Sequence, residues 1–120
     1  MFSKALIVDD EEDIGLMVSR ILTKEGMQVQ YVSRVEAARQ KLESETFQLY
    51  LLDLNLPDGT GLDLIPEIRK EKGSKPRIIV ISAYDGPYEM KKVQEEKVDL
   101  FMKKPFNKRQ LIDAIEGLKV

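Results

Sequence analysis

The sequence lacks two residue types that serve much of enzyme chemistry, because its 120 residues include no cysteine and no histidine. Without cysteine the chain can form no disulfide, no thiolate nucleophile and no cysteine-ligated metal site. Without histidine it has no Ser-His-Asp triad, no histidine metal site and no usual general base near neutral pH. Any chemistry must therefore come from carboxylates, hydroxyls, amides and lysines.

Long hydrophobic runs and a strong excess of charge are also missing. No unbroken apolar run exceeds four residues, as at 5–8, which is too short for a transmembrane helix or a signal-peptide core. We therefore predict no membrane contact, and the lack of an export signal and of cysteine favours the cytoplasm. The 19 basic and 21 acidic residues give a net charge of −2, unlike a nucleic-acid-binding domain.

The residues that are present are typical of one globular domain. Apolar residues make up 42% of the chain and charged residues 33%, a balance that favours a folded core over disorder. A chain of 120 residues has room for one core of ordinary size. We predict a single domain over residues 1–120.

Apolar segments along the chain alternate between two patterns. Short apolar runs, typical of buried strands, occur at 5–8, 29–32, 47–52, 78–81 and 98–102. Each run is followed by a segment with helical features: at about 14–22, 36–42 and 62–68, from Pro87 onward, and at 111–118 after a cap at Asn107. Five strand–helix units in succession predict an α/β fold with a parallel sheet.

Several residues mark where the predicted helices begin or end. Ser33, three residues before Glu36, and Asn107, three before Gln110, each predict a capping box. Gly86-Pro87 predicts a helix start, Pro66 must lie in a first helical turn, and Gly26 suits a helix end. For the helix that ends at Gly26, Glu11, Glu12 and Asp13 suit its positive end, and a local explanation of Asp10 as its cap stays open.

Right-handed crossovers leave few arrangements for five such units. We predict a flavodoxin-like, doubly wound five-stranded parallel sheet in the order 2-1-3-4-5, with helices on both faces. In such folds the functional site lies beyond the carboxyl ends of the strands, where the first and third strands are neighbours. The residues at the strand ends are therefore the candidates for function.

Four strands end in polar residues that together could handle a phosphoryl group. The first ends in Asp9-Asp10, the third in Asp53 and the fourth in Ser82, while the fifth ends in Lys103-Lys104. Three converging carboxylates need a compensating cation, and oxygen ligands of this kind suit Mg²⁺. A carboxylate nucleophile, a metal, an ammonium and a hydroxyl are the parts of an aspartyl-phosphate site.

These motifs, in this order, resemble a response-regulator receiver domain, the phosphoacceptor module of two-component signalling. The resemblance extends from Lys4 to Leu118. It depends on four segments that stand at strand ends: Ile7-Val8-Asp9-Asp10-Glu11, Leu52-Asp53-Leu54-Asn55-Leu56-Pro57 through Gly61, Ser82-Ala83, and Lys104-Pro105-Phe106.

The resemblance implies a role for each residue of the site. Asp53 would take the phosphoryl group from a kinase phosphohistidine, while Lys104, singled out from Lys103 by its place next to Pro105, and Ser82 would bind the phosphoryl oxygens. The Lys104-Pro105 bond would be cis. Mg²⁺ would be held by Asp9, Asp10, Asp53 and the backbone carbonyl of Asn55.

The resemblance also implies a switch. Phe101, where tyrosine is commoner, would move inward when Ser82 moves, and the signal would leave through the surface of the fourth helix, fifth strand and fifth helix. Asn55 and Tyr84 would control phosphate lifetime; we expect shielding by Tyr84 to outweigh positioning of water by Asn55. The small residue pair usual before the fifth strand is replaced by Glu96-Lys97.

The implied partners are a sensor histidine kinase or phosphotransfer protein and an unknown downstream effector, with a phosphorylation-linked dimer left open. Leu16 falls opposite the apolar stripe of its helix and would belong to the kinase-docking surface. The domain would catalyse only its own phosphorylation and dephosphorylation. Two alternatives stay open: a Mg²⁺-dependent phosphatase, although Asn55 stands where a haloacid-dehalogenase enzyme needs an acid, and an adaptor that takes no phosphate.

Overall fold

The computed structural model describes residues 2–70 and 75–119, so Met1, residues 71–74 and Val120 of the predicted 1–120 domain lie outside the described residues. Five parallel strands form one sheet in the order β2-β1-β3-β4-β5, which confirms the predicted topology. The strands are β1 (Lys4–Val8), β2 (Gln28–Val32), β3 (Leu49–Asp53), β4 (Arg77–Ser82) and β5 (Leu100–Lys103).

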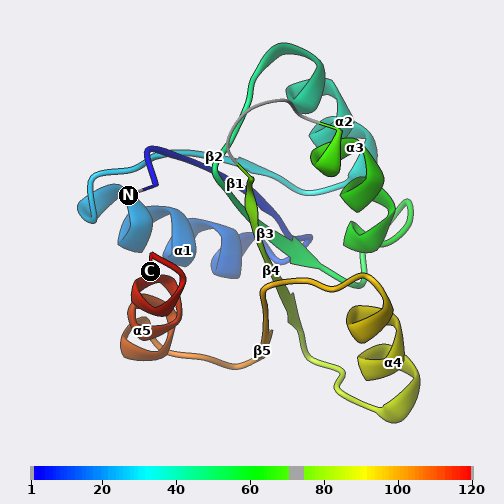
Figure 1. The fold of residues 1–120 in the computed structure, drawn as a ribbon. Helices are drawn as coiled ribbons and strands as arrows, with labels where there is room; N and C mark the ends of the chain where they lie inside the picture. The colour runs from blue at the N-terminus through cyan, green and yellow to red at the C-terminus, as the bar shows by residue number, and fades with distance from the viewer. Residues whose placement is uncertain (1, 71–74, 120) are drawn as a thin grey trace.

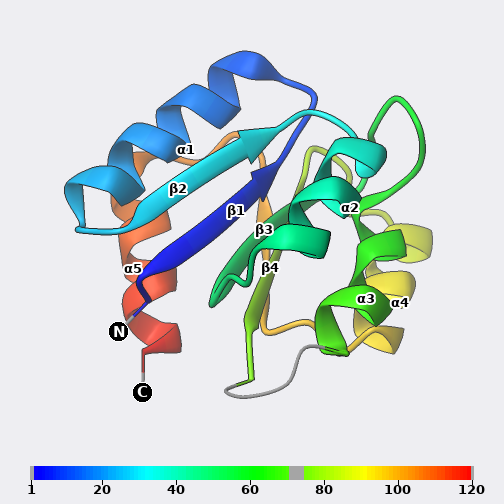
Figure 2. The ribbon, with the colours of Figure 1, turned by 90° about the horizontal axis from the view of Figure 1, so that it is seen from above.

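Helices cover both faces of this sheet. They are α1 (Glu12–Lys24), α2 (Val35–Ser44), α3 (Ile65–Arg69), which a 3₁₀ turn η1 (Gly61–Leu64) precedes, α4 (Pro87–Glu95) and α5 (Lys108–Leu118). Figures 1 and 2 show α1 and α5 on one face of the sheet and α2, α3 and α4 on the other. None of the helices in the described part of the chain is long and apolar enough to cross a membrane.

The two covered faces explain why β1 is apolar at four successive positions, 5–8. On β1, Ala5 and Ile7 pack toward α1 and α5, whereas Leu6 and Val8 pack toward α2 and α3. Side chains alternate across a strand, so a strand covered on both faces needs apolar residues throughout. The apolar run therefore ends where the sheet ends, and the next residue, Asp9, stands at its edge.

Most predicted boundaries agree with the structure, with small shifts. β3 begins at Leu49 and β5 at Leu100, each two residues later than predicted, although Phe47 is buried. Pro66 lies in the first turn of α3, and Pro87 opens α4. Gly26 has φ of 93°, a left-handed conformation that suits the end of α1.

The predicted cap of α2 is wrong. The N-cap residue of α2 is Arg34, and its side chain makes no capping hydrogen bond. The backbone N–H groups of Val35 and Glu36 instead donate to the Asp58 carboxylate, at 2.7 and 3.0 Å. Asp58 lies 23 residues further along the chain, and these bonds hold its pKa below the ordinary value, with the Glu36 N–H the larger cause. The N–H groups that the Ser33 motif is predicted to cap are therefore bound by an acceptor from a distant loop.

At two other helix starts, one predicted cap is confirmed and one alternative explanation is removed. The Asn107–Gln110 capping box at the start of α5 is present, with both reciprocal bonds formed. Asp10 does not cap α1, because the N-cap residue is Glu11, which makes no side-chain cap bond. Glu96-Lys97, the pair that replaces the usual small residues before β5, forms the turn into that strand. Lys97 has φ of 54°, and its carbonyl accepts a 3.0 Å hydrogen bond from the Arg69 side chain.

Candidate functional site

The buried polar side chains of the described residues gather at one edge of the sheet. They are Asp9, Asp53, Ser82 and Lys104, and each stands at or just beyond the carboxyl end of its strand. Burying charged groups is costly unless they are paired. This edge is therefore the place where the sequence accepts an energetic cost that the rest of the core avoids.

Lys104 lies at the centre of this group. Its Nζ is 2.9 Å from Asp9 Oδ2, 3.1 Å from Asp53 Oδ2 and 2.6 Å from Glu11 Oε1. Two of these contacts are hydrogen bonds, to Glu11 and Asp53, whereas Asp9 Oδ2 is an ion-pair partner that accepts no hydrogen bond from the described residues. The Lys104 N–H also donates to the Ser82 carbonyl at 2.8 Å, and the Lys104-Pro105 peptide bond is cis.

The electrostatics of the group follow from burial and from the excess of carboxylates. Burial is the largest influence on Asp9, and it raises the pKa of this residue to about 6. Burial alone would lower the pKa of Lys104, but the close carboxylates of Glu11, Asp9 and Asp53 outweigh it and raise that pKa. Lysine is thus held firmly as a cation, while one of its partners is poised to accept a proton.

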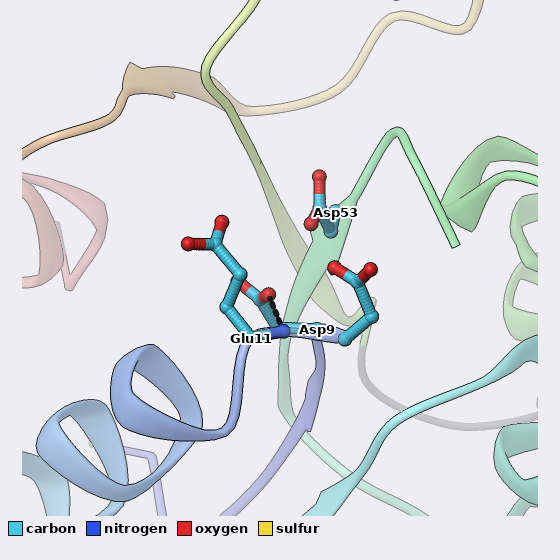
Figure 3. A group of neighbouring side chains, drawn as sticks. Asp9, Glu11 and Asp53 are labelled. Atoms are coloured by element: carbon cyan, nitrogen blue, oxygen red, sulfur yellow. Dashed lines mark hydrogen bonds between the residues drawn. The ribbon is translucent and has the colours of Figure 1, made fainter. Parts of the chain in front are cut away.

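The chain also holds the carboxylates from behind by backbone bonds. The Glu11 N–H donates to Asp9 Oδ1 at 2.8 Å, and the Asn55 N–H donates to Asp53 Oδ1 at 3.2 Å. Figure 3 shows Asp9 and Glu11 reaching from the β1–α1 loop toward Asp53 at the end of β3, with the Glu11–Asp9 bond dashed. Each carboxylate therefore keeps an oxygen directed toward the common centre.

The donor set fits a hard divalent cation. Asp9, Asp10, Glu11 and Asp53 each offer a carboxylate oxygen, and these oxygens lie within 4.8 Å of one another. Two of the acids are buried and two are exposed, so the cluster opens to solvent on one side. All the donors are oxygens, which Mg²⁺ prefers.

The predicted switch and lifetime residues surround this centre on the β4–β5 side. Ser82 is fully buried, and its Oγ accepts a 3.0 Å bond from the Tyr84 N–H. The Tyr84 side chain itself is 60% exposed. Phe101 is half-buried and packs against the small cluster of Leu54, Val80 and Val93. Leu16, on the α1 side of the site, is 42% exposed, as predicted, beside Met17, Arg20 and Lys108.

Gly61 supports the acceptor strand by its lack of a side chain. A Cβ on Gly61 would lie 2.5 Å from the Asp53 carbonyl oxygen and 2.7 Å from Leu52 Cβ. Only glycine allows the loop after Asp53 to return this closely onto the end of β3. The glycine belonged to the motif quoted from the sequence, but its reason is visible only in the fold.

Sequence reasoning missed three contributors. Glu11 was expected only to favour the positive end of α1, yet its carboxylate binds Lys104. The Tyr31 hydroxyl donates to the Asp9 carbonyl at 2.6 Å, and burial is the main cause of the raised pKa of this phenol. Asp58 caps α2 from the loop after Asp53. The place of Glu11 next to Asp10 could have indicated that it belongs to the site, but no local motif indicates Tyr31 or Asp58.

Fold and site together define a doubly wound α/β domain with a buried acid–lysine cluster at its topological switch point. The sequence model of the family described as "Response regulator receiver domain" matches residues 5–116. The receiver domain protein (CheY-like) from Methanospirillum hungatei JF-1 is similar in structure, with a TM-score of 0.88 and 28% identity over 98% of this chain and 94% of that one.

Two further relatives agree. The BeF₃-activated receiver domain of DrrB, a Thermotoga maritima protein, has a TM-score of 0.87 and 25% identity, with full coverage of both chains. The response regulator protein PilR of Pseudomonas aeruginosa is 41% identical over 81 residues, which cover 68% of this chain but only 18% of that relative. The chain belongs to the response-regulator receiver family, the signal-transducing domains of two-component systems.

Proposed function

We propose that this domain is a switch that accepts a phosphoryl group on Asp53. The observation that carries the proposal is the 3.1 Å contact between Lys104 Nζ and Asp53 Oδ2 at a buried strand end. A buried carboxylate next to a fixed ammonium is a nucleophile with a group ready to stabilise the charge on an incoming phosphoryl group. Family membership supports the same assignment.

In the proposed reaction, an Asp53 carboxylate oxygen attacks the phosphorus of a phosphohistidine on a sensor kinase or a phosphotransfer protein. The new O–P bond forms as the P–N bond breaks, and the bonding electrons leave with the imidazole nitrogen. The product is an acyl phosphate on Asp53. Lys104 and Ser82 bind the phosphoryl oxygens, and Lys104 must exchange a carboxylate contact to do so.

Asp9, Asp10, Asp53 and the Asn55 backbone carbonyl would hold Mg²⁺, which when bound supplies the positive charge that offsets the carboxylates and the phosphoryl oxygens. Asp9 and Asp10 contribute by being fixed at the edge of β1, and Asp53 by ending the neighbouring β3. The donor set described above supports this assignment.

The output follows from Ser82 and Phe101. When the Ser82 hydroxyl moves to the phosphoryl group, it releases space into which Phe101 packs, and the α4–β5–α5 surface changes for a downstream effector or a second phosphorylated copy. Asn55 and Tyr84 set the lifetime of the phosphate, and Tyr84 must leave its exposed position to shield the site. Leu16 belongs to the surface that meets the kinase.

We place this activity in the cytoplasm, in one domain over residues 1–120 that turns over no outside substrate and binds no nucleic acid. A Mg²⁺-dependent phosphatase would hydrolyse a small phosphate ester repeatedly, whereas the proposed switch takes up one phosphoryl group per chain. Turnover of p-nitrophenyl phosphate therefore separates the two activities.

The direct test is phosphorylation by acetyl phosphate with Mg²⁺, followed by intact mass. The wild type should gain about 80 Da, one phosphoryl group. Asp53→Asn should lose this gain and stay folded, whereas Asp13→Asn, an exposed acid in the first turn of α1, should keep it. A gain that persists in Asp53→Asn would overturn the assignment, and chelation of Mg²⁺ should stop uptake.

A further inference from the structure

The Tyr31 side chain connects the edge strand β2 to the acidic loop. Its hydroxyl donates to the Asp9 carbonyl oxygen at 2.6 Å, across 22 residues of sequence. We propose that Tyr31 is a positioning residue that fixes the peptide plane between Asp9 and Asp10 and thereby sets the affinity of the acidic cluster for Mg²⁺. This inference rests on the proposed function, because it assigns Mg²⁺ to that cluster.

The other polar groups of Asp9 are held by other parts of the chain. Its N–H donates to the Val32 carbonyl at 3.1 Å, its Oδ1 accepts from the Glu11 N–H, and its Oδ2 forms an ion pair with Lys104 but accepts no hydrogen bond within the described part of the chain. The carbonyl oxygen of Asp9 is the group that Tyr31 holds. Asp9 is fully buried, so this carbonyl needs a partner within the protein.

The Asp9 carbonyl matters because it belongs to the peptide that leads into Asp10. A peptide unit is planar, so fixing the carbonyl also fixes the direction in which the chain enters Asp10. The Asp10 side chain is exposed and its carboxylate is one of the four gathered oxygens. The hydroxyl of Tyr31 thus sets the relation between a buried acid and an exposed acid that must converge on one ion.

A second observation shows that the chain makes room for this tyrosine. Gly15 is buried within α1, and a Cβ there would lie 2.3 Å from Tyr31 Cε1 and 2.5 Å from Cζ. Glycine is a poor residue inside a helix, since it gives up more conformational freedom than any other. The sequence accepts that weakness at the position where it lets the ring lie against the helix and reach Asp9.

The simpler view is that Tyr31 only fills the core, because its ring also packs against the cluster beneath α1. A core-filling role needs the ring and not the hydroxyl. Tyr31→Phe removes the hydroxyl and keeps the ring, so it separates the two roles. Tyr88→Phe is the matched control, since the Tyr88 side chain is 66% exposed and lies on α4.

The test measures Mg²⁺ binding by calorimetry and by NMR amide shifts, and it also measures the unfolding free energy of each variant. Tyr31→Phe should raise the Mg²⁺ dissociation constant about three- to tenfold, the loss of affinity expected for one neutral hydrogen bond. The amide shifts of Asp10 and Glu11 should also change in the metal-free protein. Tyr88→Phe should bind Mg²⁺ as the wild type does.

An unchanged dissociation constant in Tyr31→Phe would overturn the proposal, even if the unfolding free energy fell, because that result would indicate packing alone. A wild type that binds no Mg²⁺ would overturn both this inference and the metal in the proposed function. If Tyr31→Phe weakens Mg²⁺ binding as expected but the wild type takes up no phosphoryl group, the inference stands and only the phosphoacceptor assignment is removed.

Discussion

The two sides of the site are built differently. We call residues 8–24, 31 and 53–61 the acid side, and residues 82–103 the α4–β5 side. On the acid side, α1 buries Gly15, Val18, Ile21 and Leu22 against the sheet, and Tyr31 and Asp58 tie its loops to distant backbone groups. On the α4–β5 side, α4 buries Val93 alone, and β5 has a single buried residue, Met102.

This difference matches a division of labour in a switch. In the proposed switch, the side that would hold the metal and the nucleophile has many anchors, while the side that would change shape has few. Segments with little buried apolar surface open at lower free energy than segments with much. A phosphoryl group that contacts both sides can therefore shift the second without disturbing the first.

Removing the space for Tyr31 should break the acid side and give the largest effect. Gly15→Ala should lower the free energy of unfolding by about 2–3 kcal/mol, because its Cβ would overlap the Tyr31 ring. In a Tyr31→Ala background the same change should instead raise that free energy by about 0.5–1 kcal/mol, through helix propensity. Urea denaturation of the four proteins in this cycle measures both values.

Gly117→Ala provides the matched control for this cycle. Gly117 lies in α5, where a Cβ would meet nothing within 4 Å, so alanine should be neutral or stabilising in the wild type. If Gly15→Ala were as harmless as Gly117→Ala, the close contact between α1 and Tyr31 would not restrain the acid side.

Acidification should stabilise the acid side in metal-free buffer. The pKa of Asp9 is raised from 3.8 to about 6, mainly by burial, so the folded state holds the proton more tightly than the unfolded chain does. The contribution is fully present below about pH 4 and is lost as the pH rises through 6. Comparing wild type with Asp9→Asn should show a loss of about 2–3 kcal/mol between pH 4 and pH 7.

Mg²⁺ provides the check on this pH effect. Saturating Mg²⁺ at pH 7 should recover stability in the wild type, because a ligand that binds the folded state stabilises it. Asp9→Asn should recover less. A wild-type curve parallel to that of Asp9→Asn from pH 4 to pH 7 would contradict the burial argument.

The cap of α2 allows a smaller and more local test of the acid side. Asp58→Ala should lower the free energy of unfolding by about 1–2 kcal/mol, because two backbone N–H groups of α2 lose their acceptor. Ser33→Ala, at the residue that the sequence motif selects, should change it by less than about 0.5 kcal/mol. Thermal unfolding of both variants measures the contrast, and the reverse ranking would restore the local capping box.

The smallest effect is expected from tightening the α4–β5 side. Lys97 has φ of 54°, a left-handed conformation that costs a lysine more than a glycine. Lys97→Gly should therefore raise the free energy of unfolding by about 0.5–1 kcal/mol. Glu96→Gly, at a residue with φ of −81°, should lower it by a similar amount. Equal losses in both variants would show that the turn carries no strain.

The parts of this molecule that could be predicted are those that depend on local pattern. Strand order followed from five alternating units and the handedness of their crossovers, and the buried polar residues followed from which side chains end each apolar run. The cis Lys104-Pro105 bond came from the resemblance, not from any physical argument about the residues. Asn107 capped its helix as predicted because both partners lie within one turn.

The parts that could not be predicted depend on contacts between distant segments. Ser33 has a proper local motif, but Asp58 reaches the same N–H groups from 23 residues away. Tyr31 meets Asp9 because β1 and β2 pair with Ile7 opposite Tyr31, a register that neither strand specifies alone. Glu11 had an adequate local explanation at the start of α1, and that explanation hid its contact with Lys104.

The charge balance around Lys104 affects how strongly free anions can compete for the site. Four carboxylates face one ammonium, so a free anion that approaches the metal-free pocket meets net repulsion. Inorganic phosphate, nucleotides and acidic metabolites are abundant competitors with the same chemistry as the group to be received. Because Lys104 is already paired with carboxylates, the proposed phosphoacceptor site would discriminate against these anions when it is metal-free, and it would accept a phosphoryl group only after a cation has offset the carboxylates.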